Sequence, residues 1–285
     1  MRYYRLPGPR LVARDGDAAY DLTSARAGLE SFRDLAAAAR AAGEGLDGIA
    51  GDLLDAAETV PLTDLSADAR RPVRAGEVWA AGVTYEISEQ AREEESAMPD
   101  MYLDVYDADR PELFFKATPS RTVGPGEAVG IRADSDWDVP EPELGVVLYR
   151  GETVGYTLGN DMSSRDIEGA NPLYLPQAKV YDQCCAVGPC VVSAADVDPH
   201  DLEMSMEIVR DGERVFEDAT STGEMARTCE ELVSYLTRHN TVPEVGVLLT
   251  GTSLVPPDEF TLRAGDEVHM HIEGIGSLEN PVTTV

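Results

Sequence analysis

The chain has 285 residues, 43% of them hydrophobic, and this length allows one large domain or one large and one small domain. Its 53 Asp and Glu residues outnumber its 23 Lys and Arg residues, so the formal net charge is -30 and the pI is near 4.3. Such a surface repels nucleic acid and anionic membranes, and we exclude both as expected partners. The acids are spread through segments with apolar patterning, which indicates adaptation to high salt, where screening reduces self-repulsion.

Cysteine usage and the absence of targeting segments indicate the compartment. The four cysteines form no Cys-x-x-Cys pair, so we expect reduced thiols rather than a disulfide framework or a zinc site. The N-terminus has no apolar stretch of signal-peptide length, and no run approaches the ~20 apolar residues of a membrane span. We therefore expect a soluble, cytoplasmic protein.

The N-terminal part begins with short strand-like segments. An Ala-rich region over residues 29–57 follows, and its apolar spacing predicts two helices separated at residues 43–51. A connecting segment leads to a predicted boundary near Arg70. We expect a small N-terminal α/β domain over residues 1–70 and a catalytic domain over residues 71–285.

From residue 78 onward, short strand-like segments alternate with Gly and Pro residues. The Asp211-Gly212 pair between two such segments predicts a β-hairpin. Helices are predicted over residues 85–96 and 223–239. The larger domain is therefore expected to be mostly β with a few helices, a sandwich or roll rather than an alternating βαβ fold.

The segment VPEPELGVVL, residues 139–148, places Glu141 and Glu143 at the start of an apolar strand. Residues two apart project from the same strand face, so we expect the two carboxylates side by side. Such a pair persists when it shares a cation or a proton, or when it lies on a solvated edge. Asp161, at the end of a later strand, can supply a third oxygen to a hard divalent cation.

These residues belong to an ordered series of motifs that resembles the fumarylacetoacetate hydrolase superfamily from about residue 78 to the C-terminus. The series comprises Glu141-Pro-Glu143, Asn160-Asp-Met-Ser-Ser-Arg-Asp166, Lys179, Gly188-Pro189, Leu248 to Ser253 and Gly265 to Val282. The resemblance implies an α+β fold, a mixed β-sandwich roll, in which Glu141, Glu143 and Asp161 bind Mg2+ or Mn2+. It also implies a 2-oxo acid or 1,3-dicarbonyl substrate whose oxygens bind the metal.

One departure from the family pattern bears on the reaction. Hydrolases and decarboxylases of this superfamily usually carry a His and then a Glu after a Gly-x-Asn-Tyr segment, and this pair activates water. Here the segment is Gly82-Val-Thr-Tyr85, and no His occurs before His200. The flanking segments resemble the sugar-acid branch of the superfamily, which implies a dehydratase that converts 2-keto-3-deoxypentonate to 2,5-dioxopentanoate and water.

The resemblance assigns the proton transfers of this reaction to Lys179 and Glu112. Which of the two is the base at C3 and which is the acid at C4 stays open. The residues implied to orient the carboxylate and hydroxyl groups of the sugar acid are Arg165, Asp182, Tyr85 and Thr252. A homodimer or homotetramer is implied as well.

Several alternatives remain beside these assignments. Glu112 is alternatively a surface acid on an edge strand, and Lys179 a structural ion-pair partner of Asp182. We interpret Asp138 and Glu168 as surface acids.

Other reactions, and no reaction at all, are the alternative functions. A hydrolase or decarboxylase acting on acylpyruvate or oxaloacetate would need another base to activate water, such as Glu86 or Glu89. A non-catalytic sugar-acid-binding protein is the alternative from another class. The sequence also leaves the C4 epimer of the substrate open.

Overall fold

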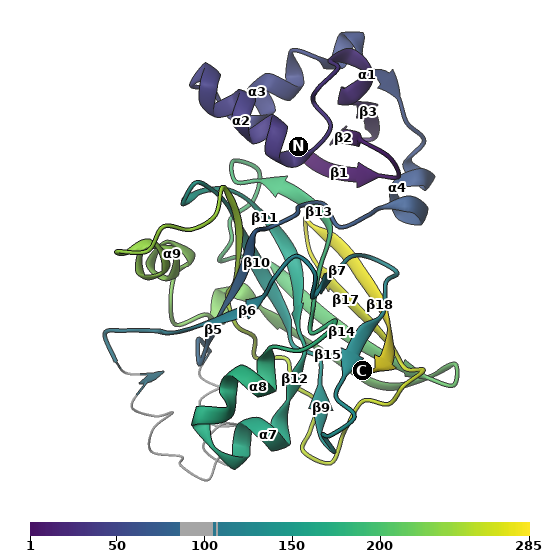
Figure 1. Ribbon diagram of the computed structural model, residues 1–285. Helices are drawn as coiled ribbons and strands as arrows, with labels where there is room; N and C mark the ends of the chain where they lie inside the picture. The colour runs from purple at the N-terminus through teal and green to yellow at the C-terminus, as the bar shows by residue number, and fades with distance from the viewer. Residues whose placement is uncertain (86–104, 107) are drawn as a thin grey trace.

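The computed structural model describes residues 1–85, 105–106 and 108–285 (Figure 1). The predicted helix over residues 85–96 lies outside this described part except for Tyr85, and so do Glu86 and Glu89. Among the described residues, no helix has both the length and the apolar character needed to cross a membrane.

A large mixed sheet forms the centre of the molecule. Its spatial order is β4 (Glu58–Thr59), β3 (Ala18–Asp21), β2 (Arg10–Asp15), β1 (Arg2–Leu6), β13 (Cys185–Ser193), β11 (Glu152–Asp161), β10 (Pro142–Tyr149), β16 (Val245–Leu249), β5 (Glu77–Gly82) and β6 (Glu112–Ala117), with β7 (Thr122–Val123) beside β13. The N-terminal elements form a lobe above the other strands (Figure 1), but β1 pairs with β13, so the sheet continues between the two parts. The domain boundary near Arg70 stays a prediction.

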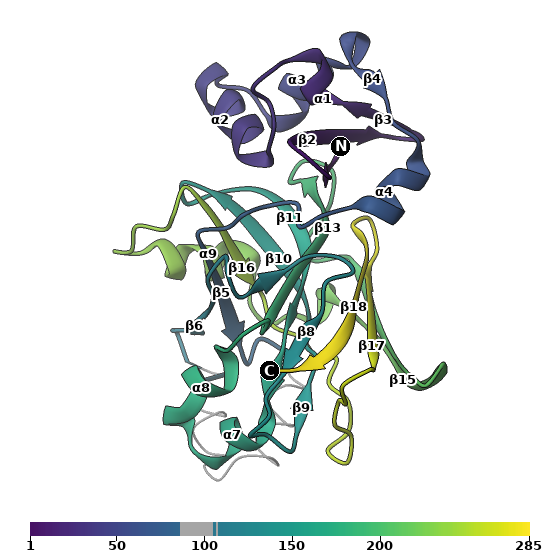
Figure 2. The same cartoon turned by 45° about the vertical axis from the view of Figure 1, so that its right-hand side comes forward.

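A second sheet packs against the first and completes the predicted sandwich (Figure 2). It contains β15 (Glu213–Ser221), β14 (Glu203–Arg210), β17 (Glu267–Ile272), β18 (Gly276–Thr284) and β8 (Val129–Ile131), and a separate pair is formed by β9 (Asp138–Val139) and β12 (Ser163–Ser164). β18 and β14 contact β13, β11 and β10. The predicted hairpin is confirmed, because β14 and β15 pair across Asp211 and Gly212, which both have positive φ.

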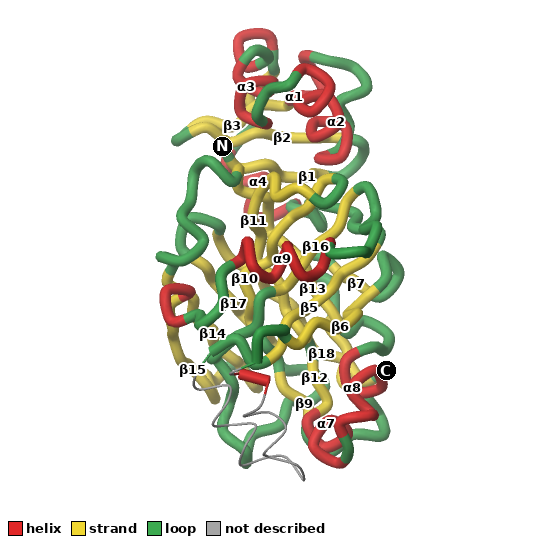
Figure 3. The backbone as a smooth tube through the Cα atoms, turned by 90° about the vertical axis from the view of Figure 1, so that its left-hand side faces the viewer, coloured by secondary structure: helices red, strands yellow, loops and turns green. Residues whose placement is uncertain are grey.

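Mostly short helices accompany the sheets in the described part of the chain. They are α1 (Leu22–Ala25), α2 (Phe32–Ala42), α3 (Leu46–Gly51), α4 (Leu62–Asp68), α7 (Arg165–Ala170), α8 (Leu175–Lys179) and α9 (Cys229–Thr237), with 3-10 turns η1 (Leu54–Ala56), η2 (Pro172–Tyr174) and η3 (Thr222–Glu224). α3 occupies most of the predicted break at residues 43–51, so that prediction is wrong in extent. α9 lies over the outer face of the large sheet (Figure 3) and begins only after Thr228, whose side chain accepts from the Glu231 amide.

The large sheet positions the predicted metal ligands. β10 is buried along its whole length between β11 and β16, and Pro142 of β10 pairs with Asn160 of β11. This antiparallel register brings the residue before β10 next to the last residue of β11. The four cysteines are buried and free, as expected of reduced thiols.

Candidate active site

Glu141, Glu143 and Asp161 form a buried carboxylate cluster where β10 and β11 meet. Their exposed fractions are 4%, 1% and 1%, and one oxygen of each lies within 4.8 Å of the others. Burial, and then the charges of Asp161 and Glu141, raise the pKa of Glu143 well above its ordinary value. The solvated-edge alternative is therefore wrong. Three crowded oxygen donors fit a hard divalent cation.

Lys179 and Arg165 both contact this cluster. Lys179 Nζ donates to Glu141 Oε2 at 2.6 Å and to Ser163 Oγ at 2.5 Å, and it lies 3.3 Å from Asp161 Oδ2. Arg165 Nη2 lies 2.8 Å from Glu141 Oε1. Arg165 begins α7 and Lys179 ends α8, so two short consecutive helices carry the two cations to the carboxylates.

Lys116 on β6 is a further cation at the cluster, and the sequence reasoning missed it. Its Nζ lies 2.5 Å from Asp161 Oδ1 and donates to the carbonyls of Met162 at 2.7 Å and Lys179 at 2.6 Å. Burial by itself lowers the pKa of Lys116, but the adjacent Asp161 raises that pKa overall. The available signal was a Lys within the apolar segment ELFFKA, four residues after Glu112 and hence on the same strand face.

The turn after β16 borders the carboxylate cluster on a further side. The Gly251 amide donates to Glu143 Oε2 at 2.6 Å. Gly251 has a φ of +87°, and a Cβ there would overlap Thr84 Oγ1, so the close approach requires glycine. Thr252 lines the same cavity. The buried Tyr85 hydroxyl has no hydrogen-bond partner among the described residues, and burial together with the Glu143 charge raises its pKa.

Glu112 lies at the rim of the site. It pairs with Gly82 of β5, and a Cβ at Gly82 would overlap the Glu112 carboxylate, so this carboxylate rests on the Gly82 backbone. Gly82 and Phe114 line the cavity beside the carboxylate cluster. Lys179 Nζ lies 5.5 Å from the centre of the Phe114 ring. Because strand side chains alternate, Glu112, Phe114 and Lys116 share the face of β6 that meets the site.

Asp182 is exposed, and the two positions predicted as surface acids, Asp138 and Glu168, are buried. Asp182 is exposed in the turn after α8, and its contact with the substrate stays a prediction. Asp138 and Glu168 are 2% and 3% exposed, which contradicts their interpretation as surface acids. Both lie on short elements, β9 and α7, that pack inward. Burial raises the pKa of Asp138 to about 6.

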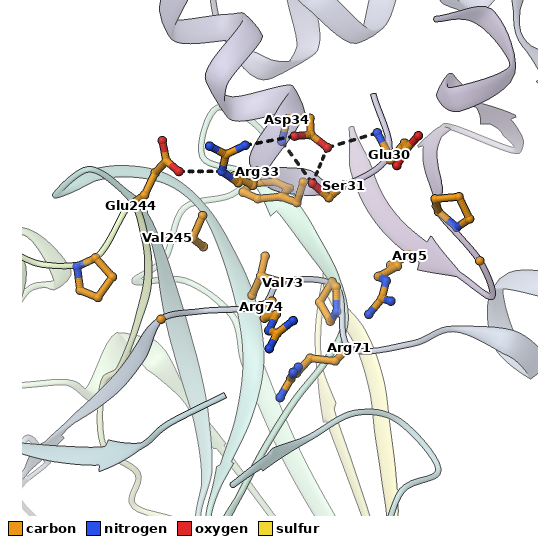
Figure 4. Close-up of a pocket in the computed structure, with 16 residues that line it drawn as sticks. Arg5, Glu30, Ser31, Arg33, Asp34, Arg71, Val73, Arg74, Glu244 and Val245 are labelled. Atoms are coloured by element: carbon orange, nitrogen blue, oxygen red, sulfur yellow. Dashed lines mark hydrogen bonds and ion pairs between the residues drawn. The ribbon is translucent and has the colours of Figure 1, made fainter. Parts of the chain in front are cut away.

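Two cavities differ in their fit to the predicted chemistry. The space beside the carboxylate cluster has a volume of about 20 Å3, which suits a single ion or water molecule. A cavity of about 710 Å3 lies where the N-terminal lobe meets the rest of the chain, with Arg5, Arg71 and Arg74 among its lining residues (Figure 4). None of the predicted site residues lines the larger cavity, so we place the candidate active site at the smaller one.

Known proteins resemble this chain over all or most of its length. It is 66% identical over 289 residues, covering 100% of both chains, to the Haloferax volcanii protein named "Probable 2-keto-3-deoxyxylonate dehydratase". It is 45% identical over 218 residues to 2-dehydro-3-deoxy-D-arabinonate dehydratase of Saccharolobus solfataricus, covering 74% of this chain and 73% of that protein. The solved structure of 2-keto-3-deoxy-D-arabinonate dehydratase complexed with magnesium and 2,5-dioxopentanoate has a TM-score of 0.85 and 34% identity, and the match covers 100% of this chain and 99% of that chain.

The family model described as fumarylacetoacetate (FAA) hydrolase C-terminal matches residues 77–283. This range contains the whole carboxylate cluster and the three cationic side chains around it. The matched range, the sandwich architecture and the buried metal-binding geometry agree with one another. The chain belongs to the fumarylacetoacetate hydrolase family.

Proposed function

We propose that this protein is a Mg2+-dependent dehydratase that converts 2-keto-3-deoxypentonate to 2,5-dioxopentanoate and water. The observation that carries the proposal is the buried cluster of Glu141, Glu143 and Asp161 with Lys179 in direct contact. Full-length similarity to a protein named as a dehydratase of this substrate class supports it. The similar dehydratase structure that is complexed with magnesium and 2,5-dioxopentanoate supports the cofactor and the product.

The carboxylates of Glu141, Glu143 and Asp161 would hold Mg2+ or Mn2+. Either cation, when bound, polarises a 2-oxo group and makes the neighbouring C3 protons more acidic. For the loss of water, the protein's own residues must then take a proton from C3, give a proton to the C4 hydroxyl and orient the substrate.

Lys179 takes the C3 proton in this proposal. Its contacts with Glu141 and Ser163, and the Phe114 ring beside it, hold the amine at the cavity wall. Glu112 donates a proton to the C4 hydroxyl, so that the C4–O bond breaks and water leaves. Proton transfers then move the new C3–C4 double bond to C4–C5, and the resulting enol becomes the C5 aldehyde.

Three polar side chains are proposed to orient the sugar acid. Arg165 offers a guanidinium to the carboxylate, which it binds well because two N–H groups match two oxygens. Tyr85 and Thr252 offer hydroxyls, and the buried Tyr85 hydroxyl has no partner among the described residues. Asp182, which is exposed in the turn after α8, is not given a role in this proposal.

The substrate names of the two dehydratase relatives point to one compound within the D series. A 2-keto-3-deoxypentonate keeps a single stereocentre, C4, and D-xylonate and D-arabinonate have the same configuration there. We therefore propose the D form as the substrate. Offering the D and L forms separately tests this assignment, and equal turnover of both would contradict it.

The first experiment is a coupled assay in molar KCl with Mg2+ and 2-keto-3-deoxypentonate, in which a semialdehyde dehydrogenase reports 2,5-dioxopentanoate. Acylpyruvate and oxaloacetate are run in parallel. We expect aldehyde formation that EDTA removes and Mg2+ restores. No aldehyde, with pyruvate formed from acylpyruvate or oxaloacetate, would replace the dehydratase by a hydrolase or decarboxylase. Binding of the 2-oxo acid without turnover under any metal would favour the non-catalytic alternative.

The cellular environment, the oligomeric state and the domain organisation are part of the proposal as well. The net charge of -30 and the 66% identity to a Haloferax volcanii protein favour a cytoplasm of high salt. We propose a homodimer or homotetramer, with residues 1–70 and 71–285 as the two domains of each subunit. Light scattering in molar KCl measures the oligomeric state, and a monomer would contradict this proposal.

A further inference from the structure

We propose that Lys116 is a positioning residue, which orients the metal ligand Asp161 and holds Lys179 in place. The roles of Asp161 and Lys179 rest on the proposed function, whereas the contacts of Lys116 do not. Its ammonium group donates to the Met162 carbonyl and to the Lys179 carbonyl, and it forms an ion pair with Asp161 Oδ1. The side chain is 0% exposed.

The three oxygens come from chain segments that each position a part of the site. Asp161 ends β11, and Met162 leads from β11 to the short strand β12. Lys179 ends α8, which has only five residues and is too short to be stable alone. One ammonium on β6 therefore joins the end of β11 to the end of α8.

The contacts of Lys116 restrict the orientation of the Asp161 carboxylate and the position of the Lys179 backbone. Asp161 Oδ1 forms an ion pair with Lys116, and rotation of the carboxylate about its Cβ–Cγ bond would lengthen that contact. The Lys179 carbonyl is one of the last carbonyls of α8 and accepts from Lys116. The Lys179 side chain consequently starts from a fixed backbone position and reaches Glu141 Oε2 at 2.6 Å.

The composition of the chain supports a specific need for lysine at this position. The sequence contains 21 arginines and only two lysines, Lys116 and Lys179, and both are buried in this site. Arginine thus supplies the positive charge everywhere else. A compact ammonium can donate in three directions from one point, whereas a planar guanidinium cannot place its donors on the same three oxygens.

A purely electrostatic role predicts the opposite result from a positioning role. If Lys116 only offsets negative charge, its replacement by Met makes the site more negative and strengthens cation binding. If Lys116 positions Asp161, the same replacement leaves the carboxylate misoriented and weakens cation binding. The sign of the change in Mn2+ affinity therefore decides between the two roles.

The experiment measures Mn2+ binding by electron paramagnetic resonance of the free ion in molar KCl, with no substrate present. Lys116→Met is expected to weaken Mn2+ binding about tenfold to a hundredfold, the range found for groups that orient metal ligands. Lys116→Arg keeps the charge and is also expected to bind Mn2+ more weakly. The control is Arg40→Met, which removes one positive charge from an exposed helix position and should leave the Mn2+ affinity unchanged.

Tighter Mn2+ binding by Lys116→Met, or unchanged binding by Lys116→Arg, would overturn the proposal. Near-UV circular dichroism identifies variants that are folded, and if Lys116→Met does not fold, Lys116→Arg alone decides. The proposed function can fail separately. If wild-type protein binds Mn2+ and Lys116→Arg binds it weakly, but no aldehyde forms in the coupled assay, the positioning role stands and the dehydratase does not.

Discussion

Replacement of the buried acid Asp138 by Asn is expected to stabilise the protein at neutral pH. Asp138 is 2% exposed, and its Oδ1 has no hydrogen-bond partner among the described residues. Burial raises the pKa of Asp138 from an ordinary 3.8 to about 6. At 1.36 kcal/mol per pH unit, this shift of about two units corresponds to roughly 3 kcal/mol of destabilisation when the carboxylate is ionised.

The direction of this pH dependence of stability follows from the proton affinities of Asp138 in the folded and unfolded states. The folded state holds the Asp138 proton more tightly than the unfolded state does. Stability contributed by this group is therefore present below about pH 4 and is lost as the pH rises through about 6. An asparagine side chain at this position carries no charge. The backbone amide of residue 138 donates to Thr261 Oγ1 and its carbonyl accepts from the Leu262 amide, and both hydrogen bonds would remain because they do not involve the carboxylate.

The assay is denaturant unfolding of Asp138→Asn and of wild-type protein in molar KCl at several pH values between 4 and 8. The free energy of unfolding of the variant should exceed that of wild type by up to about 3 kcal/mol at pH 7.5, and the difference should shrink toward pH 4. Asp136→Asn, at an exposed position two residues earlier, is the matched control. A difference that does not change with pH would refute the reasoning.

Three further predictions concern the site and the surface. Gly82→Ala should displace the Glu112 carboxylate and lower kcat by tenfold or more. The control is Gly246→Ala, which should leave kcat unchanged because a Cβ there has only Glu77 O near it, at 3.9 Å. Equal kcat in both variants would argue against a role for Glu112. Glu141→Gln and Glu143→Gln should each remove the activity that Mg2+ restores after EDTA treatment, and full activity in both would exclude the metal site. The Tm should be lower in dilute buffer than in molar KCl. The Debye length grows from about 3 Å at 1 M to about 30 Å at 0.01 M, so the acidic side chains that give the net charge of -30 repel one another more strongly at low salt. An identical Tm in both buffers would contradict adaptation to salt.

Local sequence patterns predicted the structure correctly where neighbouring residues are sufficient to specify a turn or a strand. The Asp211-Gly212 pair adopts positive φ at both residues and joins β14 to β15, as the sequence predicted. Helix boundaries were less predictable. The Ala-rich region predicted two helices with a break at residues 43–51, but the chain re-enters a helix at Leu46, whose side chain is buried. Burial of one apolar side chain there outweighs the poor helix propensity of the glycines around it.

In the candidate site, too, some residues could be predicted from local sequence patterns and others could not. Glu141, Glu143 and Asp161 could be predicted because strand alternation and motif order suffice to bring carboxylates together. Asp138 could not be recognised as buried, since its short strand alone does not show what covers it. Asp182, three residues after Lys179, is exposed in the turn after α8, and its place in the site stays a prediction.

The sequence by itself determined the family, the sandwich of strands and the three carboxylates, because these follow from residue order and from the two-residue period of strands. Only the tertiary structure decided which neighbours those carboxylates have. Lys116 and Asp161 are 45 positions apart in sequence, and their contact depends on how β6 and α8 pack against the end of β11. Strand alternation places a side chain on a face, whereas the residues across that face are chosen by long-range packing.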